Sequence, residues 1–306
     1  VAGLFGNSDP LHNLAPTFVW VIWWVGVAYI SAFLGDIWSL INPWKITFFW
    51  AETLWSLING GKGLSPIFRY SPNWGIWPGL ILFMVFAWVE NVYSDSVMPS
   101  RISHMILIYS IITWAGMFLY GKETWLRYGE TFSLAFGFLA KFGVIGRPSN
   151  QNESQDFSPE NSEFRAHDPR ARHNHQPLHL RPFGAGLIDI DTVSIPQMLF
   201  VLSLLATVTF DGLTGTLLWI NIQSSVQEYL PSVTLVGTLG LSSSVLIFIT
   251  FYLFFCWLMS IFARTNFSFL QFGRSFVYTL IPIALAYHLA HFLMFLLIQG
   301  QLIIPL

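Results

Sequence analysis

Six long apolar stretches alternate with shorter polar segments along the chain. Each of the six can cross about 30 Å of hydrocarbon as a helix. The pattern therefore predicts an all-α fold, a polytopic transmembrane helix bundle with about six spans. The fifth stretch exceeds the length of one crossing, which indicates a tilted or protruding helix. We place the spans at Phe18–Leu34, Trp74–Val92, Ile102–Tyr120, Pro196–Trp219, Val233–Ile261 and Ser275–Ile298.

Two further stretches are apolar but interrupted by charged residues. The first is Asn42–Ile58, which contains Lys45 and Glu52, and the second is Thr124–Phe142, which contains Glu130. Apolar helices interrupted in this way are typical of the membrane interface. We therefore expect two interfacial helices, with re-entrant segments as the alternative.

The segment Gly146–Asp191 differs in kind, because it is rich in Asn, Ser, Pro, Arg, His and acids and has few large apolar residues. Such a segment buries too little apolar surface to fold alone. We expect a cytoplasmic polar linker whose first part is disordered. It would join a first transmembrane half, residues 1–145, to a second half, residues 192–306, with three spans in each. The halves show no convincing self-similarity of the kind found in inverted-repeat transporters.

Composition supports a membrane protein. Apolar residues make up 54% of the chain and charged residues only 10%, against about 25% charged in soluble domains. The net charge is −2 and the basic residues are scattered, which argues against a nucleic-acid partner. The single cysteine, Cys256, excludes an intrachain disulfide and a thiolate metal cluster. The chain opens on an uncharged segment rather than a cleavable signal peptide, so either the true start was removed or the first span is the targeting signal.

The basic residues predict an orientation, because Lys and Arg accumulate in cytoplasmic loops. If the N-terminus lies outside, thirteen of the fourteen Lys and Arg fall on the cytoplasmic side and only Arg101 falls outside. This split predicts six spans with both termini of the chain outside. The thirteen are Lys45, Lys62, Arg69, Lys122, Arg127, Lys141, Arg147, Arg165, Arg170, Arg172, Arg181, Arg264 and Arg274.

Six titratable residues from four predicted spans fall in the outer half of the bilayer in this orientation. Ionisable groups in spans are costly, so each suggests a function. Two of them are histidines three residues apart, a spacing that puts both on one helix face. The six are Glu90, Asp95, His104, Asp211, His288 and His291.

Imidazole together with carboxylate is the chemistry of a zinc or iron site and equally of a proton relay. Glu90 and Asp95 are the candidate catalytic bases. The other four residues are candidate ligands of a divalent metal such as zinc. A histidine on a helix could also ligate haem, although two on one face cannot take opposite sides of the same haem.

Each residue also has a plain structural interpretation. Glu90 and Asp95 could be solvated loop residues, and His104 could contact lipid headgroups. Asp211 could cap a helix break before a glycine, and the paired histidines could hydrogen-bond neighbouring helices. Their shared depth is what favours a functional interpretation.

Other motifs are weaker. Gly60-Gly61-Lys62-Gly63 lacks the spacing of a P-loop, and neither G-x-S-x-G nor H-E-x-x-H occurs in the sequence. A group of linker histidines invites a metal interpretation, but Arg and Pro surround them, which is typical of a solvated segment. These histidines are His167, His173, His175 and His179.

Several stretches follow the pattern of a known family, and together they cover most of the chain apart from the linker. They are Leu14–Trp20, Leu40–Lys45, Tyr109–Trp114, Thr209–Gly212, Ala290–Phe292 and Gln299–Leu306. In these stretches the chain resembles a family of uncharacterised bacterial polytopic inner-membrane proteins often labelled "fenitrothion hydrolase". The family's Phe-Asp-Gly matches Asp211 and its Ala-His-aromatic matches His291, whereas His288 matches no pattern of the family.

The resemblance implies organophosphate ester hydrolysis in a bacterial inner (plasma) membrane. It also implies that the chain is a fragment of a longer protein. Members of the family have a further span before Phe18. They also continue past Leu306 with a Ser-Asp-Pro-Phe-like segment and more helix.

Three functions remain open at this point. The first is a metal-assisted hydrolase acting from the outer leaflet, with Asp211 and His291 as ligands. The second is a transporter or proton-coupled permease, which the three-plus-three spans favour although the spans lack paired Gly/Pro breaks. The third is a non-catalytic subunit or assembly factor of a larger, respiratory membrane complex. The expected partners are the lipid bilayer and other membrane subunits.

Overall fold

The structure is a computed structural model, and it describes residues 2–61, 63–146, 178–188, 193–263 and 267–305. Within these residues, six helical segments are long and apolar enough to cross a membrane. This confirms the predicted all-α helix bundle, and the chain is a multi-pass membrane protein. The segments are Leu14–Phe33, Pro72–Asn91, Pro99–Tyr120, Ile195–Thr214, Val233–Phe262 and Phe269–Ile303.

Some spans are single helices and others are composite. The second, third, fourth and fifth spans are α6 (Trp77–Asn91, preceded by the 3-10 turn η3, Pro72–Trp74), α7 (Pro99–Tyr120), α11 (Ile195–Thr214) and α13 (Val233–Phe262). The first span joins α2 (Leu14–Pro16), the π-helix η2 (Thr17–Gly26) and α3 (Val27–Phe33). The sixth joins α14 (Phe269–Phe276), η6 (Val277–Thr279), α15 (Leu280–Gln299) and η7 (Gly300–Ile303).

Local signals fix where several spans begin. Pro99 and Pro196 stand in the first turns of α7 and α11, where a missing N–H breaks no helical hydrogen bond. Ser194 and Gln197 form a reciprocal capping box at the start of α11. The capping box hydrogen-bonds backbone N–H groups at the start of α11 that lipid could not satisfy.

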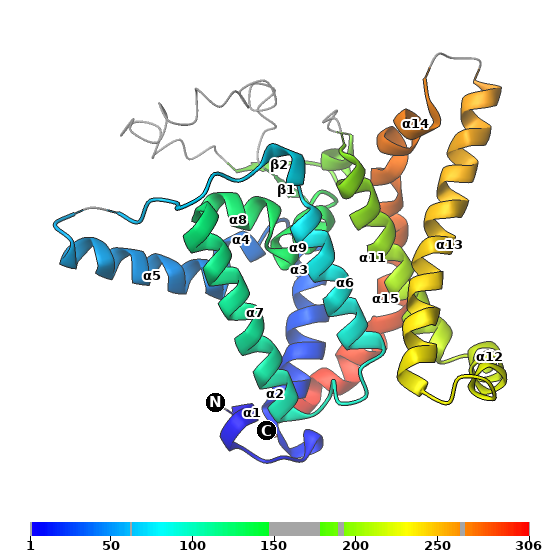
Figure 1. Cartoon of the computed structure of the whole chain (residues 1–306), viewed down its shortest axis with the longest axis horizontal. Helices are drawn as coiled ribbons and strands as arrows, with labels where there is room; N and C mark the ends of the chain where they lie inside the picture. Colours follow the sequence, from blue (N-terminus) through cyan, green and yellow to red (C-terminus); the bar gives the residue numbers. More distant parts are fainter. Residues whose placement is uncertain (1, 62, 147–177, 189–192, 264–266, 306) are drawn as a thin grey trace.

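The fourth span lies at the centre of the second half, where α11 packs against α6, α13 and α15 (Figure 1). The α1 helix (Ala2–Phe5) and η7 lie at one end of the bundle, which we call the terminal end. The strands β1 (Ile145–Gly146) and β2 (His179–Leu180) lie at the opposite end, which we call the linker end. The orientation predicted from the basic residues would place the terminal end outside.

Two of the helices outside the set of spans, α5 and α12, lie at opposite ends of the bundle. At the linker end, α5 (Pro43–Ile58) follows the first span and extends away from the other helices (Figure 1). Its Trp50, Leu57 and Ile58 are exposed, as the interfacial interpretation expects. At the terminal end, the short helix α12 (Leu217–Gln227) follows the fourth span.

The fourth span is shorter than its apolar pattern predicted. It ends at Thr214 rather than Trp219, because Thr216 caps a new helix by accepting a hydrogen bond from the Trp219 amide (3.3 Å). The Trp219 side chain is buried against Phe210, with ring centroids 5.0 Å apart. The apolar run in the sequence therefore covers parts of two helices, and α12 points in a different direction from α11.

The stretch Thr124–Phe142 was predicted as one interfacial helix, but it forms two helices. The helices are α8 (Lys122–Tyr128) and α9 (Thr131–Ala140). Most of α9 is buried, and it packs against α3, α6 and α8. The α9 sequence has no charged residue and hence no polar face to present to water. Its burial among other helices sets it apart from the exposed helix α5.

Much of the predicted linker lies outside the described residues, together with Lys62, Arg264 and three of the four linker histidines, His167, His173 and His175. The end of the linker is described. There β2 pairs antiparallel with β1, with Ile145 opposite Leu180. The Arg181 guanidinium donates to the carbonyls of Gly143 (3.0 Å), Ala140 (3.0 Å) and Lys141 (3.2 Å). A cation thus satisfies carbonyls at the C-terminal end of α9, where the helix dipole favours positive charge.

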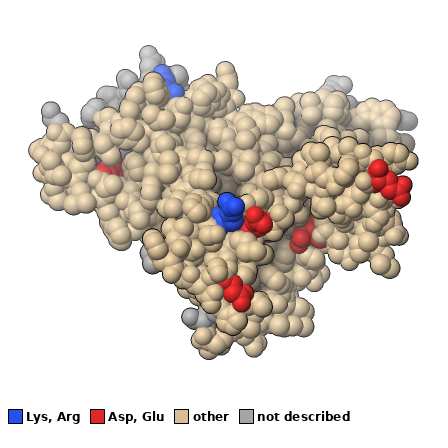
Figure 2. All heavy atoms as spheres, turned by 60° about the horizontal axis from the view of Figure 1, so that its bottom comes forward, with Lys and Arg blue, Asp and Glu red and all other residues tan. Residues whose placement is uncertain are grey.

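Charged side chains are sparse on the surface. Figure 2, which brings the terminal end of the bundle forward, shows small separate patches of acidic and basic residues on a largely uncharged face. The longest single helix among the described spans, α13, has many exposed large apolar side chains. A surface of this kind suits contact with lipid.

Candidate functional site

Asp211 and His291 form a hydrogen-bonded pair between two spans. Asp211 lies on α11 and His291 on α15, and Oδ2 of Asp211 is 2.8 Å from Nε2 of His291. The side chains are 29% and 36% exposed, so the pair is accessible at the edge of the helix contact. Gly212 helps to bring the helices together, because a Cβ at this position would stand 3.2 Å from the Tyr287 hydroxyl and 3.8 Å from the His291 ring.

Glu90 approaches this pair from a third helix. It lies one residue before the end of α6 and is half-buried. Its carboxyl is close enough to Asp211 for the two to interact electrostatically, and the side chain of Trp24 is also a neighbour. The structure therefore brings two acidic groups and one imidazole together from α6, α11 and α15.

His288 lies one turn before His291 on α15 and is 5% exposed. Its ring meets Tyr29 edge-on at 5.2 Å and Phe292 at 4.7 Å between centroids. The Tyr29 hydroxyl donates to the His288 carbonyl oxygen (3.0 Å) and not to the ring. Neither ring nitrogen has a hydrogen-bond partner among the described residues.

Asp95 and His104 lie apart from this group. Asp95 follows α6 in a turn and pairs with Arg101 at 3.9 Å, with both side chains well exposed. His104 is exposed on α7, and its Nδ1 lies 2.6 Å from the Ser100 carbonyl oxygen one turn earlier. Asp95 thus has the exposed position of a loop residue, and the polar contact of His104 lies within its own helix.

The arrangement has the chemistry of an acid–base centre. A carboxylate bonded to one ring nitrogen fixes the tautomer and orientation of a histidine and stabilises its protonated form. With Nε2 of His291 held by Asp211, Nδ1 is the nitrogen left to exchange a proton with water or a substrate. Such positioned imidazoles commonly act as general bases.

A metal centre is less well matched by the described residues. Among them, no group of three or more His, Cys, Asp or Glu side chains lies where it could hold a metal ion. Catalytic zinc normally takes three protein ligands, and here only Asp211 and His291 are in direct contact. The four predicted ligands are therefore not assembled into one cluster.

Known proteins offer no guide to this site. Comparisons with protein-family models, curated proteins and solved structures find no match to the chain.

Glu130 is a buried carboxylate that the sequence pattern did not single out. It is fully buried at the N-terminus of α9 and caps that helix. Its Oε1 accepts from the Tyr109 hydroxyl (2.5 Å) and the Phe132 amide (3.0 Å). Its Oε2 accepts from the Trp38 indole (3.2 Å), the Asn42 amide (3.2 Å) and both the amide and hydroxyl of Ser133 (2.7 and 2.6 Å).

Six hydrogen bonds to one carboxylate leave it little capacity for a substrate. No Lys or Arg side chain is among its hydrogen-bond partners, so the N-terminal dipole of α9 and the donors stabilise the negative charge. The sequence signal was an acidic residue directly before a ten-residue uncharged run, which is a helix-start pattern. We interpret Glu130 as the residue that anchors α9, not as part of a reactive site.

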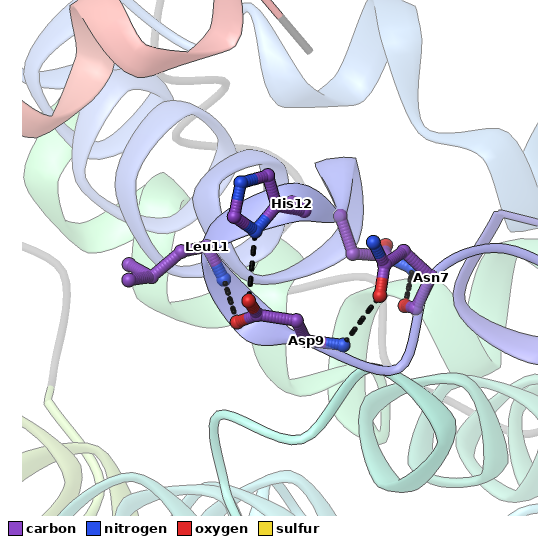
Figure 3. A network of polar contacts seen from close by, with 5 residues as sticks. Asn7, Asp9, Leu11 and His12 are labelled. Carbon is purple, nitrogen blue, oxygen red and sulfur yellow. Dashed lines mark hydrogen bonds and ion pairs between the residues drawn. The ribbon is translucent and has the colours of Figure 1, made fainter.

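A second Asp–His pair lies at the terminal end (Figure 3). Asp9 accepts from the Leu11 amide (3.0 Å), and its other oxygen lies 2.7 Å from Nδ1 of His12. The amide hydrogen bond from Leu11, and then the one from His12, hold the pKa of the Asp9 carboxyl below its usual value. Both side chains are strongly exposed, and they cap the local turn η1 (Pro10–His12). This pair is a local structural feature.

Proposed function

We propose that this membrane protein is a hydrolase in which the Asp211–His291 pair acts as a general acid–base centre on an ester substrate. The direct 2.8 Å contact between a carboxylate and an imidazole on two spans carries the proposal. The resemblance to proteins labelled "fenitrothion hydrolase" supports an organophosphate triester as the substrate class. Partial exposure of both side chains supports access for water and for an apolar ester dissolved in the membrane.

In this mechanism Nδ1 of His291 removes a proton from water as the water oxygen bonds to the phosphorus atom. The bond from phosphorus to the aryloxide then breaks, and the proton on His291 passes to the departing oxygen or to solvent. Asp211 stabilises the imidazolium while it carries the proton.

The first test compares hydrolysis of an aryl phosphotriester by the purified protein and by Asp211→Asn and His291→Gln variants. General acid–base groups typically contribute about 100- to 10,000-fold, so each variant should lose at least about 100-fold in kcat. Asp95→Asn and His104→Gln are matched controls, because these residues lie outside the site, and both should retain activity. Full activity in the two site variants, or none in the wild type, would overturn the proposal.

A chelator separates this mechanism from the metal-assisted one. An acid–base pair without a metal predicts that treatment with a strong zinc chelator leaves the rate unchanged. Loss of activity on chelation and its return on adding zinc would instead support a metal centre, with further ligands supplied by residues other than Asp211 and His291.

For the setting of this activity, we propose a bacterial inner membrane with the terminal end of the bundle outside. The thirteen-to-one distribution of basic residues supports this orientation. The ester substrate would then reach Asp211 and His291 from the outer leaflet.

A proton-coupled permease is the second candidate. The observation that favours it is the presence of three ionisable side chains, Asp211, His288 and His291, on two adjoining spans. Proteoliposomes holding a pH-sensitive dye would test it. A proton flux in response to a pH gradient that Asp211→Asn abolishes would support the permease, and proton-tight vesicles would count against it.

A further inference from the structure

The helix α12 connects two spans at the terminal end of the bundle. It follows α11, which ends at Thr214, and precedes α13, which begins at Val233. Figure 1 shows α12 turned away from the directions of both spans. Because α11 and α13 both leave the hydrocarbon at this end, α12 lies at the level of the membrane boundary.

A buried aromatic side chain attaches α12 to the bundle. Trp219 in its first turn packs edge-on against Phe210 of α11, with ring centroids 5.0 Å apart. The same indole lies so close to α13 that a Cβ at Gly240 would stand 2.1 Å from it. Contacts with both spans therefore fix the start of α12 relative to the bundle.

The rest of α12 has two unlike faces. At 3.6 residues per turn, Leu218, Ile222 and Val226 follow one another along one side, which we call the apolar stripe. Leu218 and Ile222 are exposed and Val226 is half-buried. The other side carries exposed polar residues, which we call the polar stripe. These are Asn221, Ser224 and, directly after the helix, Glu228.

We propose that α12 is an interfacial helix, docked on the bilayer boundary at the terminal end with its apolar stripe in the lipid and its polar stripe toward water. The helix is continuous with two membrane spans, so the partner that meets its exposed apolar side chains at this level is lipid. The proposal goes beyond the proposed function and does not depend on it.

Docking of α12 also fixes the depth of the Asp211–His291 pair. Asp211 lies three residues before the end of α11, which is about 5 Å along the helix axis at 1.5 Å per residue. A helix held at the boundary therefore keeps this pair near the membrane surface, within reach of both water and lipid.

Nitroxide labelling of single cysteines tests the docking in the full chain reconstituted in lipid nanodiscs. Leu218→Cys and Ile222→Cys place the label on the apolar stripe, and Asn221→Cys and Ser224→Cys place it on the polar stripe. Collisions with oxygen, which concentrates in hydrocarbon, and with a water-soluble nickel chelate are measured at each position. The ratio of oxygen to nickel collisions should be severalfold higher on the apolar stripe than on the polar stripe.

Two further positions calibrate the ratio. Leu246→Cys on the exposed side of α13 gives the value for hydrocarbon, and Glu123→Cys on α8 gives the value for water. All of these side chains are exposed, so a label displaces no buried group, and the native Cys256 is buried.

Two results would overturn the proposal. Nickel accessibility at Leu218 and Ile222 equal to that at Glu123 would show that α12 stands in water, away from the lipid. Low accessibility to both oxygen and nickel along the apolar stripe would show that protein covers it, as in contact with a second copy of the chain. The measurement needs no substrate, so its outcome is independent of ester hydrolysis.

Discussion

Glu130 and Asp211 are both carboxylates within the helix bundle, yet their surroundings suit them to different tasks. Glu130 is fully buried and accepts six hydrogen bonds from four segments of the chain. Asp211 is partly exposed and bonds to one imidazole. A saturated carboxylate holds structure in place, whereas one bonded to a single protonatable ring can assist chemistry.

Replacing Glu130 by Gln should destabilise the fold without touching the Asp211–His291 site. A Gln side chain has only one acceptor oxygen, so its amide group must face either the Phe132 N–H or the donors of Trp38, Asn42 and Ser133. At least one buried donor then loses its partner, at a cost of about 1–3 kcal/mol, and the favourable charge at the helix N-terminus is also lost. Unfolding in mixed detergent micelles would measure the loss.

Glu123→Gln is the matched control for this change, because Glu123 is exposed on the neighbouring helix α8. It should alter the free energy of unfolding by less than about 0.5 kcal/mol. Equal stability of the Glu130 and Glu123 variants would contradict the anchoring role.

Sequence reasoning could place the candidate residues by depth but not by direction around each helix. Glu90, Asp211 and His291, which were predicted to lie in the outer half of the bilayer, also come together in the bundle. His104 lies on α7, where its ring is exposed and its nearest polar contact is one turn back on the same helix. The depth of a residue in the membrane follows from counting residues along its span. The direction of its side chain depends on which face of the helix is buried. When the faces of a helix have similar polarity, the sequence does not show which face that is.

The helix α9 is the element that the apolar pattern explained least. Its interruption at Gly129 and Glu130 resembles the charged interruptions of a surface helix, and only the packing distinguishes them. In α5 the charges leave an exposed apolar side, and Lys122 pairs with Glu52 at 2.9 Å. In α9 the charge is at the helix start and the apolar residues are enclosed on all sides. The shorter fourth span likewise depended on a threonine cap that hydropathy does not detect.

Two glycines test how tightly these elements pack. A Cβ at Gly116 of α7 would stand 2.2 Å from the indole of Trp125 on α8, so Gly116→Ala forces the helices apart. Overpacking of this kind costs about 1–3 kcal/mol. Thermal unfolding of the purified variant should show a corresponding fall in midpoint.

Gly137 in α9 provides the matched control, because a Cβ there meets nothing within 4 Å. Gly137→Ala should be neutral or stabilising by up to about 1 kcal/mol, since alanine is the better helix former. Equal unfolding midpoints for the two alanine variants would contradict the close contact between α7 and Trp125.

At the scale of the whole molecule, the number of spans followed from hydropathy alone and agrees with the structure. The orientation rests on the distribution of Lys and Arg. Cysteine labelling can test it directly, because the native Cys256 is fully buried and gives little background. Glu228→Cys after α12 should react with a membrane-impermeant maleimide added outside intact cells.

Glu123→Cys lies at the opposite end of the bundle and should react only after the membrane is permeabilised. Both positions are exposed, so a lack of reaction reports location rather than burial. The reverse pattern would invert the orientation, and labelling of both from the same side would contradict the single span, Ile195–Thr214, that lies between them among the described residues.

The central claim is that Asp211 and His291 act as one unit, and a double-mutant cycle on ester hydrolysis tests it most directly. Residues that act as a unit show strongly non-additive effects. If Asp211 works by orienting and charging His291, the double variant Asp211→Asn/His291→Gln should lose no more activity than the more damaged single variant. Losses that multiply, so that the double variant falls by the product of the two single effects, would contradict the account.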